Sequence, residues 1–324
     1  MIDKYGRTID YLRISLTDRC NLRCIYCMPQ EGVPLLCQED ILTFDEILRV
    51  CGCSASLGIR KIKLTGGEPL IRLGCADLAG KIKELPGIEK VTITTNGILL
   101  ADYITDLIDA GIDGINISLD TLDDETFRQI TRRDGIDRVL LGLKAALSYP
   151  KLSVKINSVP VVREESNLVS LASLARKYPV HVRFIEMMPI GYGKQFPFQD
   201  ENSIIQILEK AYGPLKPVRE KYGNGPCHYY EIDGFLGKIG FISAVTHKFC
   251  SRCNRVRLTP EGFLKGCLQF QKGADLRKIL REGRTDHELT EAIRNVIYNK
   301  PAGHHFYEAN TDLDEVRGMS QIGG

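Results

Sequence analysis

Between residues 8 and 188, short runs rich in β-branched residues alternate with longer segments of helical period. The runs predict six β-strands: IDYLRIS, KIKLTG, VTITTNG, GINISLD, LSVKINSVP and HVRFIEM. Helical patterns follow at about residues 44–58, 74–84, 100–110, 123–148 and 167–178. Thr43 and Glu46 have capping-box spacing at the first of these, and Gly58 is a plausible C-cap. Six β-α units in series imply a parallel sheet, open or curled into a partial barrel, with sites at the carboxyl ends of its strands.

The pattern changes after residue 212. Residues 212–226, rich in glycine and proline, predict a link between two domains, residues 1–217 and 218–324. Residues 228–243 predict a pair of strands, and two helical segments end near Asn299. The tail ends in MSQIGG and is too polar and short to be a core element.

Charge and cysteine content narrow the functional classes. Forty-three basic and 41 acidic residues give a formal charge of +2, so no general footprint for nucleic acid or membrane is present. No signal peptide or membrane-spanning run is visible, and we expect a cytoplasmic protein. Because the cytosol keeps thiols reduced, eleven cysteines favour metal binding or catalysis over disulfides.

Cys20, Cys24 and Cys27 form a tight group in TDRCNLRCIYCMP, spaced C-x3-C-x2-C. A zinc site or an ordinary iron-sulfur cluster takes four protein ligands. Three cysteines on one loop leave one iron of a cubane cluster open, and an open metal position is where small molecules react. A zinc knuckle completed by a distant histidine, or no site at all, fits the same spacing.

Cys250, Cys253 and Cys267 form a second group that also stops at three. His247 is available as a fourth ligand for zinc. Against zinc, the segment is crowded with positive charge, which suits an anionic cluster and a phosphate-bearing ligand beside it. The basic residues are Lys248, Arg252, Arg255, Arg257 and Lys265.

The first group, with Tyr26 as its aromatic residue and GGEP after the next strand, resembles the radical S-adenosylmethionine superfamily. The resemblance implies that S-adenosylmethionine binds the open iron of a 4Fe-4S cluster. An electron from the reduced cluster then cleaves it to methionine and a 5'-deoxyadenosyl radical.

The two cysteine groups, CNRVRLT and the terminal SQIGG together resemble one branch, the GTP 3',8-cyclase family of molybdenum cofactor biosynthesis, from about residue 5 to the last glycine. The resemblance implies a partial (β/α)6 TIM-type barrel with a C-terminal α+β extension carrying a second 4Fe-4S cluster. It implies a lyase that converts GTP to (8S)-3',8-cyclo-7,8-dihydroguanosine 5'-triphosphate. The ribose 3' hydrogen is abstracted, C3' then attacks guanine C8, and a further electron and proton give the cyclic dihydro nucleotide.

The resemblance also assigns contacts to S-adenosylmethionine. Gly67 lies against it, Gly66 and Glu68 hold its ammonium, Ser118 contacts its ribose and Met188 its adenosine, with Tyr26 in the same site. Each has a plainer reading: a strand-end turn for the glycines, a cap for the serine, and core packing for Met188 or its neighbour Met187.

Contacts to GTP follow in the same way, and the second cluster's open iron binds the guanine. The implied residues are Arg13, Lys63, Thr94, Lys155, Arg255, Val256 and Arg257. Lys63 stands where arginine is common in the family, so the bidentate fork is lost. Gly323 and Gly324 reach the active site and act there with Arg255 and Arg257, although a terminal Gly-Gly is also typical of a frayed end.

Partners are implied only by the resemblance. They are GTP as substrate, a reductase or flavodoxin-type electron donor, cyclic pyranopterin monophosphate synthase as product acceptor, and a second copy in a homodimer. Two alternatives stay open: a peptide-modifying radical enzyme with an auxiliary cluster, and a zinc-stabilised binding protein. The remaining five cysteines match no ligand spacing: Cys37, Cys51, Cys53, Cys75 and Cys227. His304 and His305 are a possible metal-binding pair, with a structural role favoured.

Overall fold

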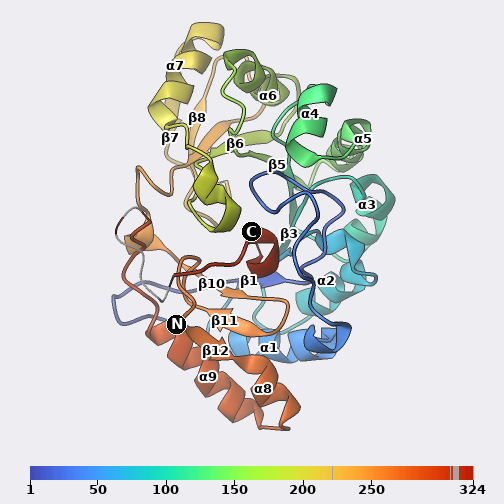
Figure 1. Ribbon diagram of the computed structural model, residues 1–324, viewed down its shortest axis with the longest axis vertical. Helices are drawn as coiled ribbons and strands as arrows, with labels where there is room; N and C mark the ends of the chain where they lie inside the picture. Colours follow the sequence, from blue (N-terminus) through green and yellow to red (C-terminus); the bar gives the residue numbers. More distant parts are fainter. Residues whose placement is uncertain (221, 307, 309–313, 324) are drawn as a thin grey trace.

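The computed structural model describes residues 1–220, 222–306, 308 and 314–323. Its centre is a curved sheet whose middle strands run parallel (Figure 1). Six strands lie in chain order, each hydrogen-bonded in parallel to the next, so the predicted strands are confirmed. They are β1 (Tyr11–Ser15), β2 (Lys61–Thr65), β3 (Lys90–Thr95), β4 (Gly114–Ser118), β5 (Ser153–Ser158) and β6 (His181–Ile185).

Helices cover the outer face of this sheet, as crossover connections between parallel strands require. They are α1 (Phe44–Ser56), α2 (Cys75–Lys83), α3 (Leu100–Asp109), α4 (Asp124–Thr131), α5 (Ile136–Leu147) and α6 (Glu165–Lys177). Thr43 and Glu46 form the predicted capping box of α1, and Gly58 has a φ of 94° just beyond its end. The helical pattern predicted over about residues 123–148 is formed by two helices rather than one. Arg132 at φ 55° and Gly135 at φ 131° leave the helical region and divide it into α4 and α5.

The C-terminal part of the chain extends the same sheet at both ends. β10 (Arg255–Leu258) pairs in parallel with β1, and β11 (Phe263–Lys265) and β12 (Gly273–Asp275) continue outward from it. At the far end β9 (Ile239–Ile242) pairs with β6, followed by β8 (His228–Glu231) and β7 (Lys216–Val218). The predicted strand pair over residues 228–243 is therefore confirmed. The domain division at residue 217 stays a prediction.

The remaining helices are α7 (Glu201–Tyr212), α8 (Leu276–Arg281), α9 (Asp286–Tyr298) and α10 (Met319–Ile322), with 3-10 turns η1 (Gln38–Asp40), η2 (Pro69–Ile71), η3 (Gly191–Gln195) and η4 (Cys250–Arg252). The expectation that the tail contributes no core element is wrong. Ile322 of α10 is 1% exposed and packs with Ile190 and Leu268 in a small apolar cluster. This cluster joins the tail to the loop after β6 and to the loop after Cys267.

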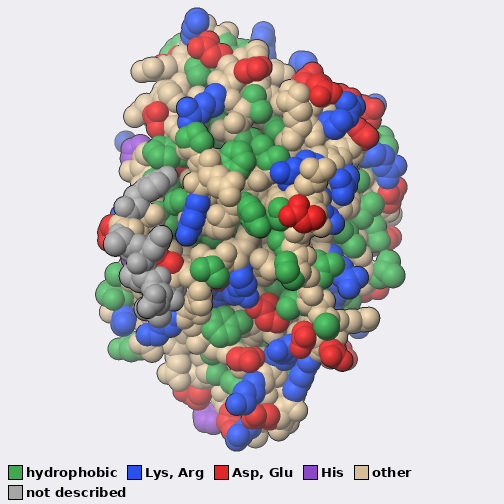
Figure 2. Space-filling view, viewed as in Figure 1, with side chains coloured by type: hydrophobic (Ala, Val, Ile, Leu, Met, Phe, Trp, Pro, Cys, Tyr) green, Lys and Arg blue, Asp and Glu red, His purple; other side chains and the backbone are tan. Residues whose placement is uncertain are grey.

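The outer surface carries both signs of charge. On the face in Figure 2, Lys and Arg are interspersed with Asp and Glu, in keeping with the net charge of +2. None of the helices in the described ranges is both long and apolar enough to cross a bilayer.

Candidate active site

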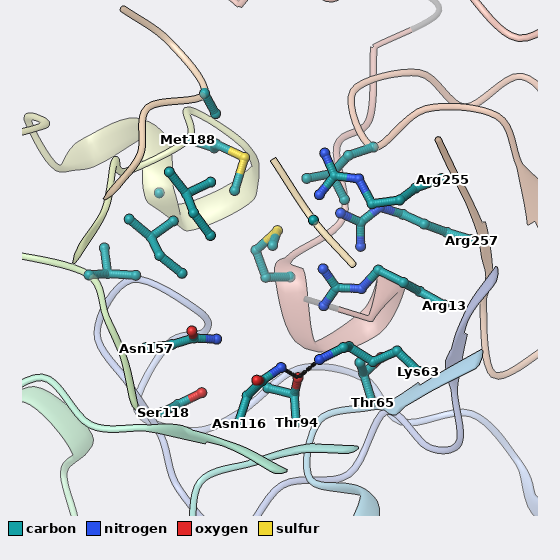
Figure 3. Close-up of a pocket in the computed structure, with 18 of the residues that line it drawn as sticks. Arg13, Lys63, Thr65, Thr94, Asn116, Ser118, Asn157, Met188, Arg255 and Arg257 are labelled. Atoms are coloured by element: carbon teal, nitrogen blue, oxygen red, sulfur yellow. Dashed lines mark hydrogen bonds between the residues drawn. The ribbon is translucent and has the colours of Figure 1, made fainter. Parts of the chain in front are cut away.

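Cationic side chains stand in one row across three neighbouring strands. Arg13 on β1 is in register with Arg257 on β10 and with Lys63 on β2. Side chains at equivalent positions of neighbouring parallel strands point to the same face of a sheet. Figure 3 shows all three projecting into one cavity, with Arg255 beside Arg257. The sheet therefore builds a concentrated positive wall from residues far apart in the chain.

Burial and mutual repulsion disfavour the charged forms of these side chains when no anion is bound. Burial lowers the pKa of Lys63 well below its ordinary value, and repulsion from Arg183 and Arg13 lowers it further. Burial and then Arg183 bring the pKa of Lys155 down to about 8. The pKa of Arg257 is also well below its usual range, because of burial and then repulsion from Arg13. A bound polyanion would relieve both the burial and the mutual repulsion.

Thr94 links two side chains on the floor of the cavity. Its hydroxyl accepts hydrogen bonds from Lys63 Nζ at 3.4 Å and from Asn116 Nδ2 at 3.2 Å (Figure 3). The first of these bonds ties the Lys63 ammonium on β2 to the neighbouring strand β3. Thr94, predicted as a ligand contact, therefore also fixes a neighbouring cation.

Arg183 on β6 is a further cation of the cavity that the sequence reasoning missed. It is 8% exposed, and its Nη2 donates to Asn157 Oδ1 on β5 at 2.5 Å. The alternation in HVRFIEM places it on the same face as the other cations, since Asn157 and Arg183 are register partners. The period-2 alternation of this strand, together with the positive charge of residue 183, is the sequence signal that identifies Arg183.

Val256 differs from its neighbours Arg255 and Arg257. Successive side chains of a strand point to opposite faces, so the two arginines enter the cavity and Val256 faces away. Its side chain is 1% exposed and belongs to the main apolar core. The Val256 side chain therefore does not line the cavity, and the GTP contact expected at this residue stays a prediction.

The first cysteine group lies on the loop that follows β1. Cys20, Cys24 and Cys27 all line the cavity. The Leu22 N–H donates to Cys20 Sγ at 3.4 Å, and Asn96 Nδ2 lies 3.8 Å from the same sulfur. Burial raises the pKa of Cys20 to about 11 and that of Cys24 well above its usual value. Iron binding here must therefore release protons from buried thiols.

The second cysteine group lines the same cavity in a more positive setting. Cys250 begins η4, Cys253 directly follows it, and Cys267 lies on the loop after β11. Burial raises the pKa of Cys253, but Arg255 and Lys300 outweigh burial and bring it down to about 6. The Arg255 Nη2 lies 3.9 Å from Cys253 Sγ. Cys253 is thus a thiolate at neutral pH, the form that binds metal.

Among the side chains that the structure describes, no three of His, Cys, Asp or Glu converge closely enough to hold one metal ion. The four ligand atoms of a zinc ion lie within about 2.3 Å of the metal, whereas the thiolates of a cubane cluster each bind a different iron atom. His247 Nδ1 lies 3.5 Å from Glu201 Oε2, and the residue does not line the cavity. His247, the residue available as a fourth zinc ligand, therefore lies apart from the cysteines that line the cavity.

The segment Gly66, Gly67 and Glu68 is a scaffold for the first cysteine loop. The Gly67 N–H donates to Thr17 O at 2.7 Å, and the Glu68 N–H donates to Arg19 O at 2.8 Å. A Cβ on Gly67 would lie 2.2 Å from Arg19 O. The close backbone approach that requires glycine is thus to the residue before Cys20.

The Glu68 carboxylate also accepts hydrogen bonds from other parts of the protein. It accepts from the N–H of Leu70, the N–H of Asn96 and the hydroxyl of Thr95, at 2.6 to 3.1 Å. Burial raises its pKa to about 7. It ties the ends of β2 and β3 together beside the cysteine loop.

Replacing Gly67 with alanine is expected to displace the loop that carries Cys20. We expect less iron per chain and at least a roughly 10-fold loss of S-adenosylmethionine cleavage, because the alanine methyl overlaps backbone that cannot move aside. Iron analysis and quantification of 5'-deoxyadenosine measure the two effects. Gly52→Ala on α1, where a Cβ meets nothing within 4 Å, is the matched control. Equal behaviour of the two variants would contradict this role.

The predicted S-adenosylmethionine contacts belong to the same cavity as the cysteines and the cations. Tyr26, Gly67, Ser118 and Met188 all line the cavity, and Figure 3 shows Ser118 and Met188 across from the cations. Met187 lines it too. The individual contacts stay predictions.

Asp120 holds Tyr26 in the cavity wall. The Tyr26 hydroxyl donates to Asp120 Oδ2 at 2.6 Å, and the Val159 N–H donates to Oδ1 at 2.7 Å. In the sequence, Asp120 is only the last residue of the strand run GINISLD.

The tail enters the cavity beside the cation row. Arg257 Nη1 donates to Gly323 O at 2.9 Å. Gly323 has a φ of 78°, and a Cβ there would lie 2.7 Å from Ser15 Cβ, so no side chain fits. Gly323 therefore contacts the cation row through Arg257, and its role in the active site stays a prediction. Gly324 lies outside the described residues.

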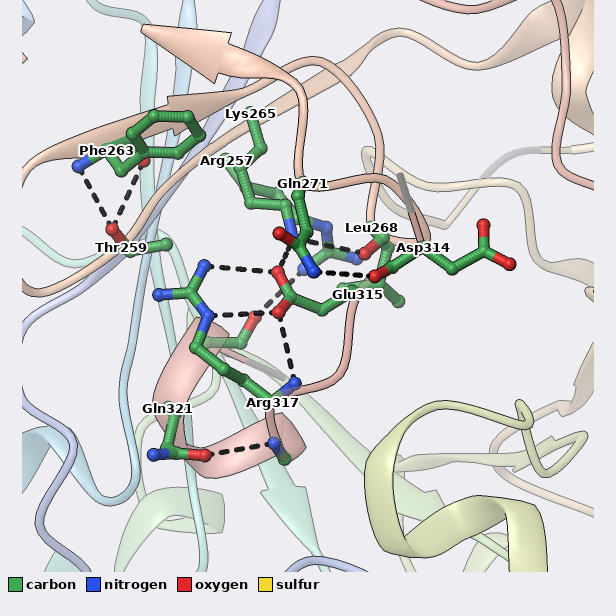
Figure 4. A network of polar contacts seen from close by, with 12 residues as sticks. Arg257, Thr259, Phe263, Lys265, Leu268, Gln271, Asp314, Glu315, Arg317 and Gln321 are labelled. Carbon is green, nitrogen blue, oxygen red and sulfur yellow. Dashed lines mark hydrogen bonds and ion pairs between the residues drawn. The ribbon is translucent and has the colours of Figure 1, made fainter. Parts of the chain in front are cut away.

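A buried polar network anchors the tail to the loop of the second cysteine group (Figure 4). Glu315 pairs with Lys265 and accepts from Arg317 Nε at 3.0 Å. Gln271 Nε2 donates to Asp314 O at 2.8 Å. Burial raises the pKa of Glu315, but Arg317 and Lys265 outweigh burial and bring it to about 2. The carboxylate stays ionised at all ordinary pH values and keeps the tail in place.

His304 and His305 do not form a metal site in this arrangement. His304 Nε2 lies 2.7 Å from Ala244 O, and His305 Nε2 lies 3.4 Å from Asp314 Oδ1. Each histidine ring thus interacts with a neighbouring group of the protein.

A partial barrel with three cysteines on the loop after its first strand is typical of one class of enzyme. The family model described as "Radical SAM superfamily" matches residues 14–165, and "Molybdenum Cofactor Synthesis C" matches residues 180–306. The fold is shared with the crystal structure of Streptococcus suis SuiB bound to S-adenosylmethionine, with a TM-score of 0.61 and 17% identity over 89% of this chain and 68% of that one.

Relatives identify the branch within this class. A Clostridium perfringens (strain SM101 / Type A) protein named GTP 3',8-cyclase is 47% identical over 327 residues, covering 100% of both chains. A Heliobacterium modesticaldum protein of the same name is 43% identical over 332 residues, again covering 100% of both. The chain belongs to the GTP 3',8-cyclase family.

Proposed function

We propose that this chain cyclises GTP to (8S)-3',8-cyclo-7,8-dihydroguanosine 5'-triphosphate, using S-adenosylmethionine and two 4Fe-4S clusters, early in molybdenum cofactor biosynthesis. The observation that carries the proposal is one cavity lined by two cysteine groups and by a row of buried cations. The first cluster, when bound, supplies the electron that cleaves S-adenosylmethionine. Each group provides three ligands and so leaves room for a small molecule at its cluster.

Cys20, Cys24 and Cys27 hold the first cluster, with Gly66, Gly67 and Glu68 fixing their loop. Tyr26, Ser118 and Met188 orient S-adenosylmethionine beside it. The bound cofactor and the ribose of GTP thus share one enclosed space, in which a reactive radical is kept from water.

Cys250, Cys253 and Cys267 hold the second cluster, which receives the guanine. Arg13, Lys63, Lys155, Arg183 and Arg257 bind the triphosphate, whose negative charge compensates their mutual repulsion. Gly323, held by Arg257, closes the cavity beside the nucleotide. The chain's part in the reaction is therefore to place C3' and C8 of one GTP molecule in reach of each other.

The remaining assignments follow from the proposed reaction. A reductase or flavodoxin-type protein supplies electrons, and cyclic pyranopterin monophosphate synthase accepts the product. We place the enzyme in the cytoplasm as a homodimer.

Arg183→Gln tests the cation row at the residue that sequence reasoning missed. The KM for GTP is expected to rise roughly 10-fold or more, since a charged hydrogen bond to phosphate is lost, while GTP-independent cleavage of S-adenosylmethionine is unchanged. Steady-state kinetics with product quantification measures both. Arg176→Gln on the exposed end of α6 is the control. An unchanged KM would remove Arg183 from the triphosphate site.

A further inference from the structure

Arg7 is a buried arginine outside the cavity whose guanidinium donors all have partners. Its side chain is 4% exposed. Nε donates to Asp3 Oδ2 at 2.6 Å. Nη1 donates to the carbonyls of Cys250 and Ala302, both at 2.9 Å, and Nη2 to those of Pro301 at 2.7 Å and Lys300 at 3.3 Å. One side chain near the N-terminus thus joins a cysteine of the second group to residues 300–302.

Residues 300–303 lie between two cysteines of that group. Lys300 is 3% exposed, and its Nζ donates to the carbonyl of Gly266, the residue before Cys267, at 2.5 Å. A Cβ on Gly303 would lie 3.3 Å from Cys250 Cβ, and one on Gly266 would lie 3.3 Å from Lys300 Cα. The segment therefore contacts the backbone on both sides of the second cysteine group.

We propose that Arg7 is a positioning residue for the second cluster. Its guanidinium holds the carbonyl of Cys250 directly. It also holds the carbonyls of residues 300–302, and the Lys300 ammonium in turn holds the carbonyl of Gly266, next to Cys267. Outer contacts of this kind orient metal ligands and raise metal affinity. The inference rests on the second cluster of the proposed function.

The chemistry of the site calls for arginine. A guanidinium offers five donors in a rigid plane, whereas a lysine ammonium offers three on a flexible stem and cannot reach four carbonyls at once. Asp3 sets the plane: its Oδ1 accepts the backbone N–H of Tyr5 at 3.0 Å and of Arg7 at 2.9 Å, while Oδ2 holds Nε. Burial raises the pKa of Asp3, but hydrogen bonds from Arg7 outweigh it and lower the pKa, so the pair stays charged.

Arg7→Lys is tested in two backgrounds of the full chain after anaerobic reconstitution. In the first, Cys20, Cys24 and Cys27 are alanine, so only the second group can hold iron; in the other, Cys250, Cys253 and Cys267 are alanine. The readouts are iron retained against a chelator and the electron paramagnetic resonance spectrum of the reduced cluster. We expect roughly 10-fold weaker iron retention and an altered spectrum in the first background, and no change in the second.

Two further variants sharpen the result. Asp3→Asn is expected to act in the same direction as Arg7→Lys, because it loosens the orientation of the guanidinium. Arg49→Lys is the matched control: Arg49 also pairs with an aspartate, Asp286 at 2.6 Å, and donates to a carbonyl, that of Arg284 at 2.5 Å, but on the surface.

The outcomes separate the proposals. Equal loss of iron in both backgrounds would make Arg7 a general stabiliser of the chain and overturn the inference, as would unchanged retention in both. If the background with only the second group takes up no iron even with Arg7 present, the two-cluster proposal fails, and this inference fails with it.

Discussion

Cys267→Ala is expected to reduce GTP cyclisation by roughly 100-fold or more while cleavage of S-adenosylmethionine remains measurable. Cys267 belongs to the group that we assign to the substrate, and GTP is misplaced when the second cluster is lost. Cleavage depends on the first group, which lies on a separate loop after β1. Anaerobic assays that quantify the cyclised nucleotide and 5'-deoxyadenosine in the same sample measure both effects.

Two variants bracket this prediction. Cys24→Ala is expected to abolish both reactions, because it removes a ligand of the first cluster. Cys37→Ala is expected to change neither, because Cys37 is exposed and belongs to neither group. Equal loss of cleavage and cyclisation in Cys267→Ala would contradict the division of labour between the two groups.

Arg257→Lys is expected to produce the second large effect, a fall in cyclisation of roughly 100-fold. Arg257 stands in the cation row and donates to Gly323 O, so it positions both the triphosphate and the tail. Lysine keeps the charge but loses the planar fork that serves two partners. The kcat for cyclisation and the KM for GTP should both change, and GTP-independent cleavage of S-adenosylmethionine should not.

Arg252→Lys supplies the control for this substitution. Arg252 lies in the same segment but is exposed. A variant at Arg257 that behaves like the one at Arg252 would show that the tail contact and the cation row contribute nothing to turnover.

The sequence predicted local structure well and long-range pairing poorly. The Thr43 capping box and the six strands are local patterns of period 2 or 3.6, and all are present. That β10 joins β1 and β9 joins β6 depends on pairing across more than 50 residues, for which no local pattern exists. The sheet therefore continues at both ends, and this places the second cysteine group on the same cavity as the first.

Prediction of the site residues from the sequence has the same limit. The cysteines were found because their spacing is specific, and Arg13, Lys63 and Arg257 through a family resemblance. Arg183 was missed because an isolated arginine on a strand is usually solvated, and only the sheet register places it among the other cations. The need for glycine at residue 67 was attributed to a ligand, although Arg19 O creates it. Such close approaches between loops cannot be read from either segment alone.

The most direct test of the central claim is anaerobic reconstitution followed by iron analysis and incubation with S-adenosylmethionine, dithionite and GTP. Two 4Fe-4S clusters predict about eight irons per chain, with GTP-dependent formation of 5'-deoxyadenosine and of the cyclised nucleotide. About four irons per chain, or 5'-deoxyadenosine formation that does not respond to GTP, would contradict the proposal of a two-cluster GTP cyclase.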